Sequence, residues 1–269
     1  MIASLLLLVI GLTDVARATP SRPWRRAAVI AAWVVVGGAA SIGFGLPLLA
    51  VAGCILAALG WVLVMPSDDG PRPRRLWPVL VLALLVVGVI VADDTGESAS
   101  GSLVAAYARA PLGILMELSL PTALAGLAIA VFLTGSGNLV TRAALGRADA
   151  DQPAPAAEAP RGWRLRLGRR VIGSIEPPLT PPLPRRAGHA LRGGRVIGPL
   201  ERLLLVALAL HGSETIIAAL LAAKGIVRFP EISEDRGTGS KAEEFLVGSL
   251  VSWSLSAAAV LYLVAVQHR

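Results

Sequence analysis

The stretch AAVIAAWVVVGGAASIGFGLPLLAVAGCILAALGWVLVM, from Ala27 to Met65, contains no charged residue and decides the fold class. It is longer than the roughly 17 to 25 residues that one membrane-spanning helix needs. The sequence Gly43-Phe44-Gly45-Leu46-Pro47 interrupts it with residues that break helices. Because a helix satisfies its own backbone polar groups in lipid, we predict two spanning helices here, joined as a tight hairpin.

The composition of the whole chain supports the same fold class. Of the 269 residues, 55% are hydrophobic and 16% are charged, whereas soluble domains are roughly one quarter charged. Apolar runs recur along most of the chain instead of alternating with polar faces. We therefore predict an all-α fold, a polytopic transmembrane helical bundle with about seven spans and a disordered cytoplasmic linker.

The predicted linker divides the chain into three regions. Residues 1–141 form an N-terminal membrane region with about five spans, residues 142–195 form the linker, and residues 196–269 form a C-terminal membrane region with two spans. The predicted spans cover residues 2–15, two segments within 27–65, then 76–92, 112–133, 197–223 and 245–266. We expect Pro121 to kink the fifth span.

The first apolar run has a second interpretation, as a cleaved signal peptide with Ala16-Arg17-Ala18 as its cleavage motif. A signal peptide carries positive charge before its apolar core. Here no lysine or arginine precedes the run, and several follow it. We therefore expect a retained first helix.

Basic residues cluster between the predicted spans. The linker holds 11 arginines against four acids, a difference equal to the formal net charge of +7. Short cytoplasmic loops carry an excess of Lys and Arg, and a topology with the N-terminus outside places 19 of the 25 basic residues in the cytoplasm. We predict a protein of the inner (plasma) membrane, with its N-terminus outside and its C-terminus in the cytoplasm. Because the surplus charge lies beside spans, we expect no nucleic-acid partner.

The linker is rich in Pro, Ala and Arg and holds too few large apolar residues to form a core, so we predict disorder. Its segment RGWRLRLGRRVIGSI alternates Trp163, Leu165 and Leu167 with arginines, which gives one apolar and one cationic side if the segment is extended. One interpretation is adhesion to anionic lipid. The other is a solvated anchor that sets the topology.

Three ionisable residues fall inside predicted spans. His211 and Glu214 lie three apart near the middle of the sixth span, so in a continuous helix they share a face, and Glu117 lies near the start of the fifth. One hypothesis is a proton- or cation-linked site formed by these three. A second is hydrogen bonding between packed helices. A third is that Gly212 breaks the span and that these residues line a re-entrant turn.

The segment KGIVRFPEISEDRGTGSKAEEF, between the last two predicted spans, carries the densest group of charges. Lys224 and Arg228 lie at the end of one helix, and Glu243 and Glu244 lie at the start of the next, where charges of those signs are favoured. We expect ion pairs across this loop to tie the two helices together. The alternative is a lipid-modifying enzyme that uses Lys224, Arg228 and Glu231.

Recognisable motifs for catalysis or for a cofactor are missing from the sequence. His189 and His268 lie far apart, and no G-x-S-x-G, no H-E-x-x-H and no glycine-rich phosphate loop occurs. Cys54 is the single cysteine, which excludes an intrachain disulfide and a thiolate metal cluster. We expect no catalytic residue, no metal ion and no cofactor.

Small residues repeat at four-residue spacing in three predicted spans. The stripes are Gly248/Ser252/Ser256, Gly53/Ala57 and Gly126/Ala130. Such stripes let a second backbone approach closely. We expect each of them to be a packing face, against another span, a protein partner or a second copy of the chain.

From Gly194 onward, the string GRVIGPLERLLLVALALHGSETIIAALLAAKGIVRFPEI, followed by AEEFLVGSLVSW, resembles the C-terminal membrane region of a widespread group of uncharacterised bacterial inner-membrane proteins. The shared elements are G-R-x-I-G-x-L-E-R, A-A-K-x-x-x-R-F and A-E-x-F-L-x-G-T/S-L. That group has no established activity. The resemblance implies a shared polar frame made of Glu201, Arg202, Lys224, Arg228 and Glu244. His211 and Glu214 depart from the pattern of the group.

These features favour a non-enzymatic membrane component, surrounded by the lipid bilayer, that acts through helix packing or a partner. The alternative is a small-solute or proton/cation-coupled transporter that uses the intramembrane residues Glu214 and His211. The two functions differ in where they place those residues. Transport requires them to face a shared pathway inside the bundle.

Overall fold

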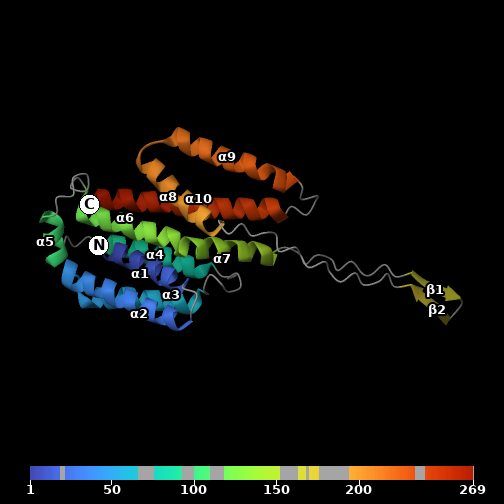
Figure 1. Ribbon diagram of the computed structural model, residues 1–269, viewed down its shortest axis with the longest axis horizontal. Helices are drawn as coiled ribbons and strands as arrows, with labels where there is room; N and C mark the ends of the chain where they lie inside the picture. Colours follow the sequence, from blue (N-terminus) through green and yellow to red (C-terminus); the bar gives the residue numbers. More distant parts are fainter. Residues whose placement is uncertain are drawn as a thin grey trace.

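The computed structural model describes residues 1–18, 22–65, 76–92, 100–109, 118–151, 163–167, 170–175, 194–233 and 240–268. Within these residues the chain forms ten α-helices, one π-helical turn and a two-stranded hairpin. Most helices lie side by side along one direction, and α9 (Glu214–Ser233) folds back beside α8 (Gly194–Leu210) and α10 (Ser240–Gln267) (Figure 1). The predicted helical fold is confirmed for the described residues outside the two strands.

The first helix, α1 (Ile2–Arg17), lies at the centre of the N-terminal part, and most of its residues are buried. It packs most extensively against α6 (Leu120–Thr134). A Cβ atom at Gly11 would lie 2.9 Å from the backbone nitrogen of Phe132, and one at Gly135 would lie 3.0 Å from the carbonyl oxygen of Gly11. Glycine at these positions lets the two helix backbones touch.

The apolar stretch from residue 27 to residue 65 forms two helices, as predicted. The first is α2 (Arg22–Gly38), which continues into the π-helical turn η1 (Ala39–Gly43), and the second is α3 (Leu48–Val64). Between them Gly45 has a φ of +69°, and a Cβ atom there would lie 2.1 Å from the carbonyl oxygen of Ser100. Only glycine fits this conformation and this contact.

Four helices follow: α4 (Trp77–Ala92), α5 (Ser102–Arg109), α6 and α7 (Ser136–Asp151). The predicted kink at Pro121 is wrong. Pro121 lies in the first turn of α6, next to the N-cap residue Ser119, where its missing N–H costs nothing. The chain bends instead at Gly135, by 43° between α6 and α7.

The prediction of one continuous sixth span over residues 197–223 is also wrong. This segment forms a helical hairpin, in which α8 ends and α9 begins on either side of Gly212. Gly212 has a φ of +71°, a left-handed conformation that ends helices and that glycine adopts without strain. The N–H of Ser213 donates to the carbonyl oxygen of Leu208, at 2.9 Å, and closes the end of α8.

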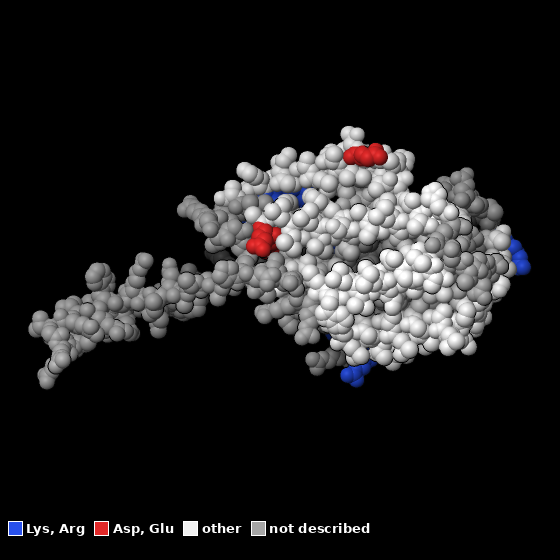
Figure 2. All heavy atoms as spheres, turned by 180° about the vertical axis from the view of Figure 1, so that it is seen from behind, with Lys and Arg blue, Asp and Glu red and all other residues white. Residues whose placement is uncertain are grey.

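Two of the described helical segments are long and apolar enough to cross a membrane, Trp24–Gly43 and Lys241–Gln267. The bent pair of α6 and α7 adds a third if it is one span, and α3 and α4 are apolar but shorter. Figure 2 shows that one face of the described surface is almost free of charged side chains. These helices support membrane association, whereas the predicted number of seven spans is not confirmed.

The small-residue stripes differ from one another in their surroundings. Ser252 and Ser256 of α10 are buried, and a Cβ atom at Gly248 would lie 3.7 Å from the side chain of Leu145 in α7. This stripe packs against helices of the same chain. At Gly53 and Gly126 a Cβ atom would meet nothing within 4 Å, so no described helix of this chain packs closely against these two glycines, and packing there against a second copy stays a prediction.

The two chain ends lie at the same end of the helical body, and the end of α7 lies at the other (Figure 1). The Ser4 hydroxyl, near the start of α1, forms a hydrogen bond of 2.7 Å with the Tyr262 hydroxyl, near the end of α10. Because α8 and α9 form a hairpin, the C-terminal region crosses the body once. The predicted orientation, with the N-terminus outside and the C-terminus in the cytoplasm, stays a prediction.

Part of the predicted linker has regular structure. Helix α7 continues past residue 141 to Asp151, and β1 (Trp163–Leu167) pairs in antiparallel fashion with β2 (Arg170–Ile175). The alternation of apolar and cationic residues in β1 has the two-residue period of a strand. The prediction of disorder therefore does not hold for these residues, and the other linker residues before Gly194 lie outside the described ones.

Candidate functional site

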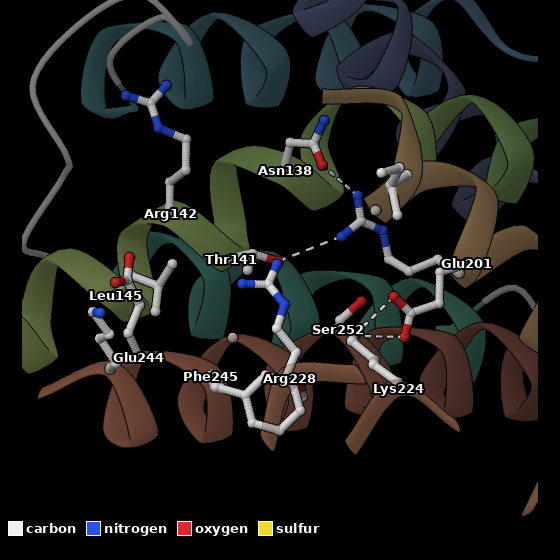
Figure 3. Close-up of a pocket in the computed structure, with 16 residues that line it drawn as sticks. Asn138, Thr141, Arg142, Leu145, Glu201, Lys224, Arg228, Glu244, Phe245 and Ser252 are labelled. Atoms are coloured by element: carbon white, nitrogen blue, oxygen red, sulfur yellow. Dashed lines mark hydrogen bonds and ion pairs between the residues drawn. The ribbon is translucent and has the colours of Figure 1, made fainter. Parts of the chain in front are cut away.

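A cavity of about 670 Å³ opens between four helices, α7, α8, α9 and α10 (Figure 3). We call it the α7–α10 cleft. Among the described residues that line it, the basic ones are Arg142, Arg202, Lys224, Arg228 and Lys241, and the acidic ones are Glu201 and Glu244. The other described lining residues are uncharged and include apolar side chains such as Phe245 and Leu145.

The hairpin of α8 and α9 builds this cleft. Because the turn at Gly212 reverses the chain, Lys224 of α9 returns to Glu201 of α8, which lies 23 residues earlier. In one continuous helix these two residues would stand roughly 35 Å apart. Helix α10 forms another wall, and Asn138 and Thr141 of α7 lie on the remaining side.

An ion pair joins three of the four helices. The ammonium of Lys224 donates to both carboxylate oxygens of Glu201, at 2.6 and 2.8 Å. Trp253 of α10 donates from its indole nitrogen to the same carboxylate at 3.2 Å, and the ammonium lies 5.7 Å from the centre of the Trp253 ring. Both charged side chains are largely buried. This pair fixes α9 against α8 and α10.

Arg202 is the largest fully buried side chain of the described chain, with 2% of its surface exposed. Its Nε donates to the carbonyl oxygen of Leu133 at 3.2 Å, and its two terminal nitrogens donate to the side-chain oxygens of Thr141, at 3.5 Å, and Asn138. Gly137 makes room for the guanidinium, because a Cβ atom there would lie 3.0 Å from its Nε. The side chain is therefore held in one place, beside the cleft.

All three acceptors of Arg202 are neutral. Among the described residues no carboxylate lies within ion-pair distance of its guanidinium, since the neighbouring Glu201 pairs with Lys224. A guanidinium has five N–H donors, and three of them are used here. A buried charge is normally paired, whereas Arg202 forms no ion pair with a described residue and brings positive charge to this side of the cleft.

The hydroxyl of Ser252 is a second incomplete group in the cleft. Its oxygen is buried and makes no hydrogen bond with the described residues. Ser256, one turn further along α10, is different, because its hydroxyl donates to the carbonyl oxygens of Ser252 and Arg202 at 3.2 and 3.4 Å. Leaving a buried hydroxyl without a partner costs about 1 to 3 kcal/mol, so Ser252 can gain from a group that enters the cleft.

One face of α10 runs along the cleft. Its lining residues recur every three or four positions, which is the spacing of a single helix face: Lys241, Glu244, Phe245, Gly248, Ser249 and Ser252. Lys241 and Ser252 are eleven residues apart, which corresponds to roughly 16 Å at the rise of an α-helix. Charged residues of α10 lie toward its start, and its serines lie deeper along the same face.

The five residues of the predicted polar frame all line this cleft: Glu201, Arg202, Lys224, Arg228 and Glu244 (Figure 3). They come from α8, α9 and α10. The predicted partners differ from the observed ones in one respect. Lys224 pairs with Glu201 across the hairpin, where the sequence suggested the acids at the start of the last helix. That pairing depends on the reversal of the chain at Gly212, which spacing alone does not reveal.

The structure separates the other predicted site residues from this cleft. His211 and Glu214 are exposed at the turn between α8 and α9. Because Gly212 breaks the helix between them, they do not share a continuous helix face, which the predicted proton- or cation-linked site requires. The broken helix agrees with the third hypothesis, a turn within the apolar run. Glu117 lies outside the described residues.

A further polar cluster surrounds Asp14, near the end of α1. The carboxylate accepts hydrogen bonds from the indole of Trp61 at 2.9 Å, the hydroxyl of Ser136 at 2.6 Å and the guanidinium of Arg17 at 3.1 Å. Arg17 also donates to the carbonyl oxygen of Met65 at 2.6 Å. With all these partners inside the protein, the cluster joins α1, α3 and α7.

No family model, curated protein or solved structure matches the chain. The resemblance of the C-terminal residues to uncharacterised inner-membrane proteins therefore stays a sequence-based prediction. Within the described part of the chain, no group of three His, Cys, Asp or Glu side chains is placed to hold a metal ion.

Proposed function

We propose that this chain is a non-enzymatic, multi-pass component of the bacterial inner (plasma) membrane that acts through a ligand or partner held in the α7–α10 cleft. The observation that carries this proposal is the convergence of five charged side chains from three helices on one cleft: Glu201, Arg202, Lys224, Arg228 and Glu244. Charged groups beside lipid are costly and usually serve a function. The two helices of spanning length support the location in a membrane.

The distribution of basic residues supports one orientation. The end of the body to which the linker is joined also carries the end of α1 with Arg17 and the start of α2 with Arg25 and Arg26, while both termini lie at the opposite end (Figure 1). By the positive-inside rule the linker end is cytoplasmic and both termini are outside. In this orientation Lys224 and Arg228 also belong to the cytoplasmic half. The topology predicted from the sequence placed them outside.

The length of α10 supports a position of the cleft at the headgroup level. The helix has 28 residues, which span about 42 Å, against roughly 30 Å for the hydrocarbon core. Lys241, Glu243 and Glu244 are charged, whereas no charged residue occurs from Phe245 to Val266. The excess length therefore falls at the start of α10, where Lys241 and Glu244 line the cleft, and Ser252 lies roughly 10 Å further along the helix than Phe245.

The two alternative functions, a lipid-modifying enzyme and a small-solute or proton/cation-coupled transporter, are less well supported. A nucleophilic lysine must be a free amine, but the ammonium of Lys224 is engaged by Glu201 and by the ring of Trp253. A transport pathway through Glu214 and His211 requires both to face the interior of the bundle, but both are exposed at a turn. Binding at the cleft needs neither condition.

Site-specific photocrosslinking in native membranes tests this proposal. A photoreactive amino acid replaces Phe245, which lines the cleft, and in a matched control it replaces Leu49 of α3, which is 88% exposed. If the cleft holds a specific molecule, Phe245 yields one dominant adduct, whereas Leu49 yields a mixture that follows the bulk lipid composition. The same adduct pattern at both positions would contradict the proposal.

A further inference from the structure

The first step concerns the charge of the α7–α10 cleft. Among the described residues, its lining holds five basic side chains against two acidic ones, and Glu201 is already paired with Lys224. Whatever pairs form among the others, basic side chains outnumber acidic ones by three. A ligand that complements this lining carries negative charge.

The second step concerns the kind of anion. Arg202 has donors to spare beyond its three neutral acceptors, and the buried hydroxyl of Ser252 has no partner among the described residues. Guanidinium and hydroxyl donors together suit a phosphate group, whose several oxygens accept from both. Phosphate-bound arginines are held by such charge-assisted hydrogen bonds in a fixed geometry, and the contacts of Arg202 already fix its position.

The third step concerns the surroundings of the cleft. Helices α8, α9 and α10, which line the cleft, also carry exposed large apolar side chains, and we call these the apolar rim: Ile197, Leu200, Phe229, Leu246 and Leu250. A soluble phosphate would leave this rim in contact with water. A phospholipid covers the rim with its acyl chains and brings its phosphate to the basic lining, and basic pockets between helices on the cytoplasmic side bind such headgroups.

From these observations we infer that the α7–α10 cleft binds the phosphate group of an anionic phospholipid from the cytoplasmic leaflet. The inference rests on the proposed function, because it names the ligand of the same cleft. Arg202 and Ser252 supply donors along its walls, and Arg142, Arg228 and Lys241 surround the headgroup with positive charge.

Native mass spectrometry of the purified full-length protein, stripped of lipid in detergent and titrated with defined lipids, provides the test. We expect phosphatidylglycerol to bind about tenfold more tightly than phosphatidylcholine, whose choline group brings positive charge into a basic cleft. The double variant Arg228→Gln/Lys241→Gln should lose most of this preference. The matched control Arg25→Gln/Arg26→Gln, on α2, should keep it.

Substitutions of two buried serines of α10 distinguish an effect on lipid binding from an effect on stability. Ser252→Ala should weaken phosphatidylglycerol binding about threefold and leave the lipid-free melting temperature unchanged or higher, since the hydroxyl has no partner among the described residues. Ser256→Ala should lower the melting temperature and keep the lipid preference, because its hydroxyl is bonded within the protein.

Three results would overturn the inference. The first is equal binding of phosphatidylglycerol and phosphatidylcholine, and the second is unchanged binding of phosphatidylglycerol to both Ser252→Ala and Arg228→Gln/Lys241→Gln. The third is displacement of phosphatidylglycerol by millimolar inorganic phosphate, because it would indicate a site for soluble phosphate. If Phe245 crosslinks to one protein while no lipid preference exists, the cleft keeps its proposed role and only the lipid assignment fails.

Discussion

Asp14 and Arg202 are both charged and buried, but of the two only Asp14 forms an ion pair with a described residue. The carboxylate of Asp14 is surrounded by donors from α1, α3 and α7. The guanidinium of Arg202 meets a carbonyl, a hydroxyl and an amide oxygen. The first residue completes a structural cluster, whereas the second leaves charge available to a ligand.

Asp14→Asn should destabilise the protein by about 1 to 3 kcal/mol. The amide keeps one oxygen, so its NH2 group must face a donor, either Arg17 or the pair Trp61 and Ser136. Denaturant unfolding in a mild detergent measures the loss. Ser4→Ala, which removes the single hydrogen bond to Tyr262, is the control and should cost less. An Asp14→Asn variant as stable as the parent would show that the cluster contributes nothing to stability.

The ion pair between Glu201 and Lys224 can be tested by a double-mutant cycle. Glu201→Gln and Lys224→Met should each destabilise the protein, because each leaves a largely buried charge without its partner. Their effects should be coupled by about 1 to 2 kcal/mol, so that the double variant loses less than the sum of the two. Unfolding in detergent provides all four free energies. Additive losses would mean that the two side chains do not interact in the membrane protein.

At the scale of elements, glycines decide how closely two helices approach. A Cβ atom at Gly11 would press on the backbone of Phe132 in α6, whereas one at Gly126 meets nothing within 4 Å. We expect Gly11→Ala to cost about 1 to 3 kcal/mol through overpacking. Gly126→Ala, at an open position of the same helix pair, should be neutral or stabilising by up to about 1 kcal/mol. Melting temperatures of the two variants in one detergent give the comparison, and equal losses would contradict the close packing.

The helices could be predicted where apolar runs end at clear breaks. The break near Gly45 and the helix from Trp77 to Ala92 follow from composition alone. The segment 197–223 could not be resolved in this way, because it is long enough to cross a bilayer and a single glycine is a weak signal inside an apolar run. Whether such a run spans or folds back depends on contacts far away in sequence.

The candidate site shows the same limit. Glu201 and Lys224 could be named from the sequence as members of a polar frame, but their contact follows only from the hairpin. Asp14 could not be singled out, because one acid at the end of an apolar run looks like a flanking residue. Its spacing of three residues before Arg17, on one helix face, was the available signal.

At the scale of the whole molecule, the hairpin changes the topology. With α8 and α9 folded together, α10 starts at the linker end and finishes beside the N-terminus, as the contact between Ser4 and Tyr262 shows. The end of α7, Arg17 and the basic residues of α9 then share one side, and a single orientation satisfies the positive-inside rule for Arg17, Lys224 and Arg228. In the topology predicted from the sequence, the two termini lie on opposite sides of the membrane, and Lys224 and Arg228 lie in an outside loop.

Cysteine labelling of intact cells distinguishes these two topologies. Single cysteines replace Ala156 in the linker and His268 at the C-terminus, in a Cys54→Ser background. We expect a membrane-impermeant maleimide to label the cysteine at position 268 and not the one at position 156, because the proposed orientation places both termini outside and the linker in the cytoplasm. Permeabilised cells, in which both positions should react, provide the control. Protection of position 268 together with labelling of position 156 would reverse the orientation and keep the fold. If neither cysteine is labelled in intact cells, the C-terminus and the linker lie on the same side of the membrane. That result would contradict the hairpin, because residues 194–268 would then have to cross the membrane twice.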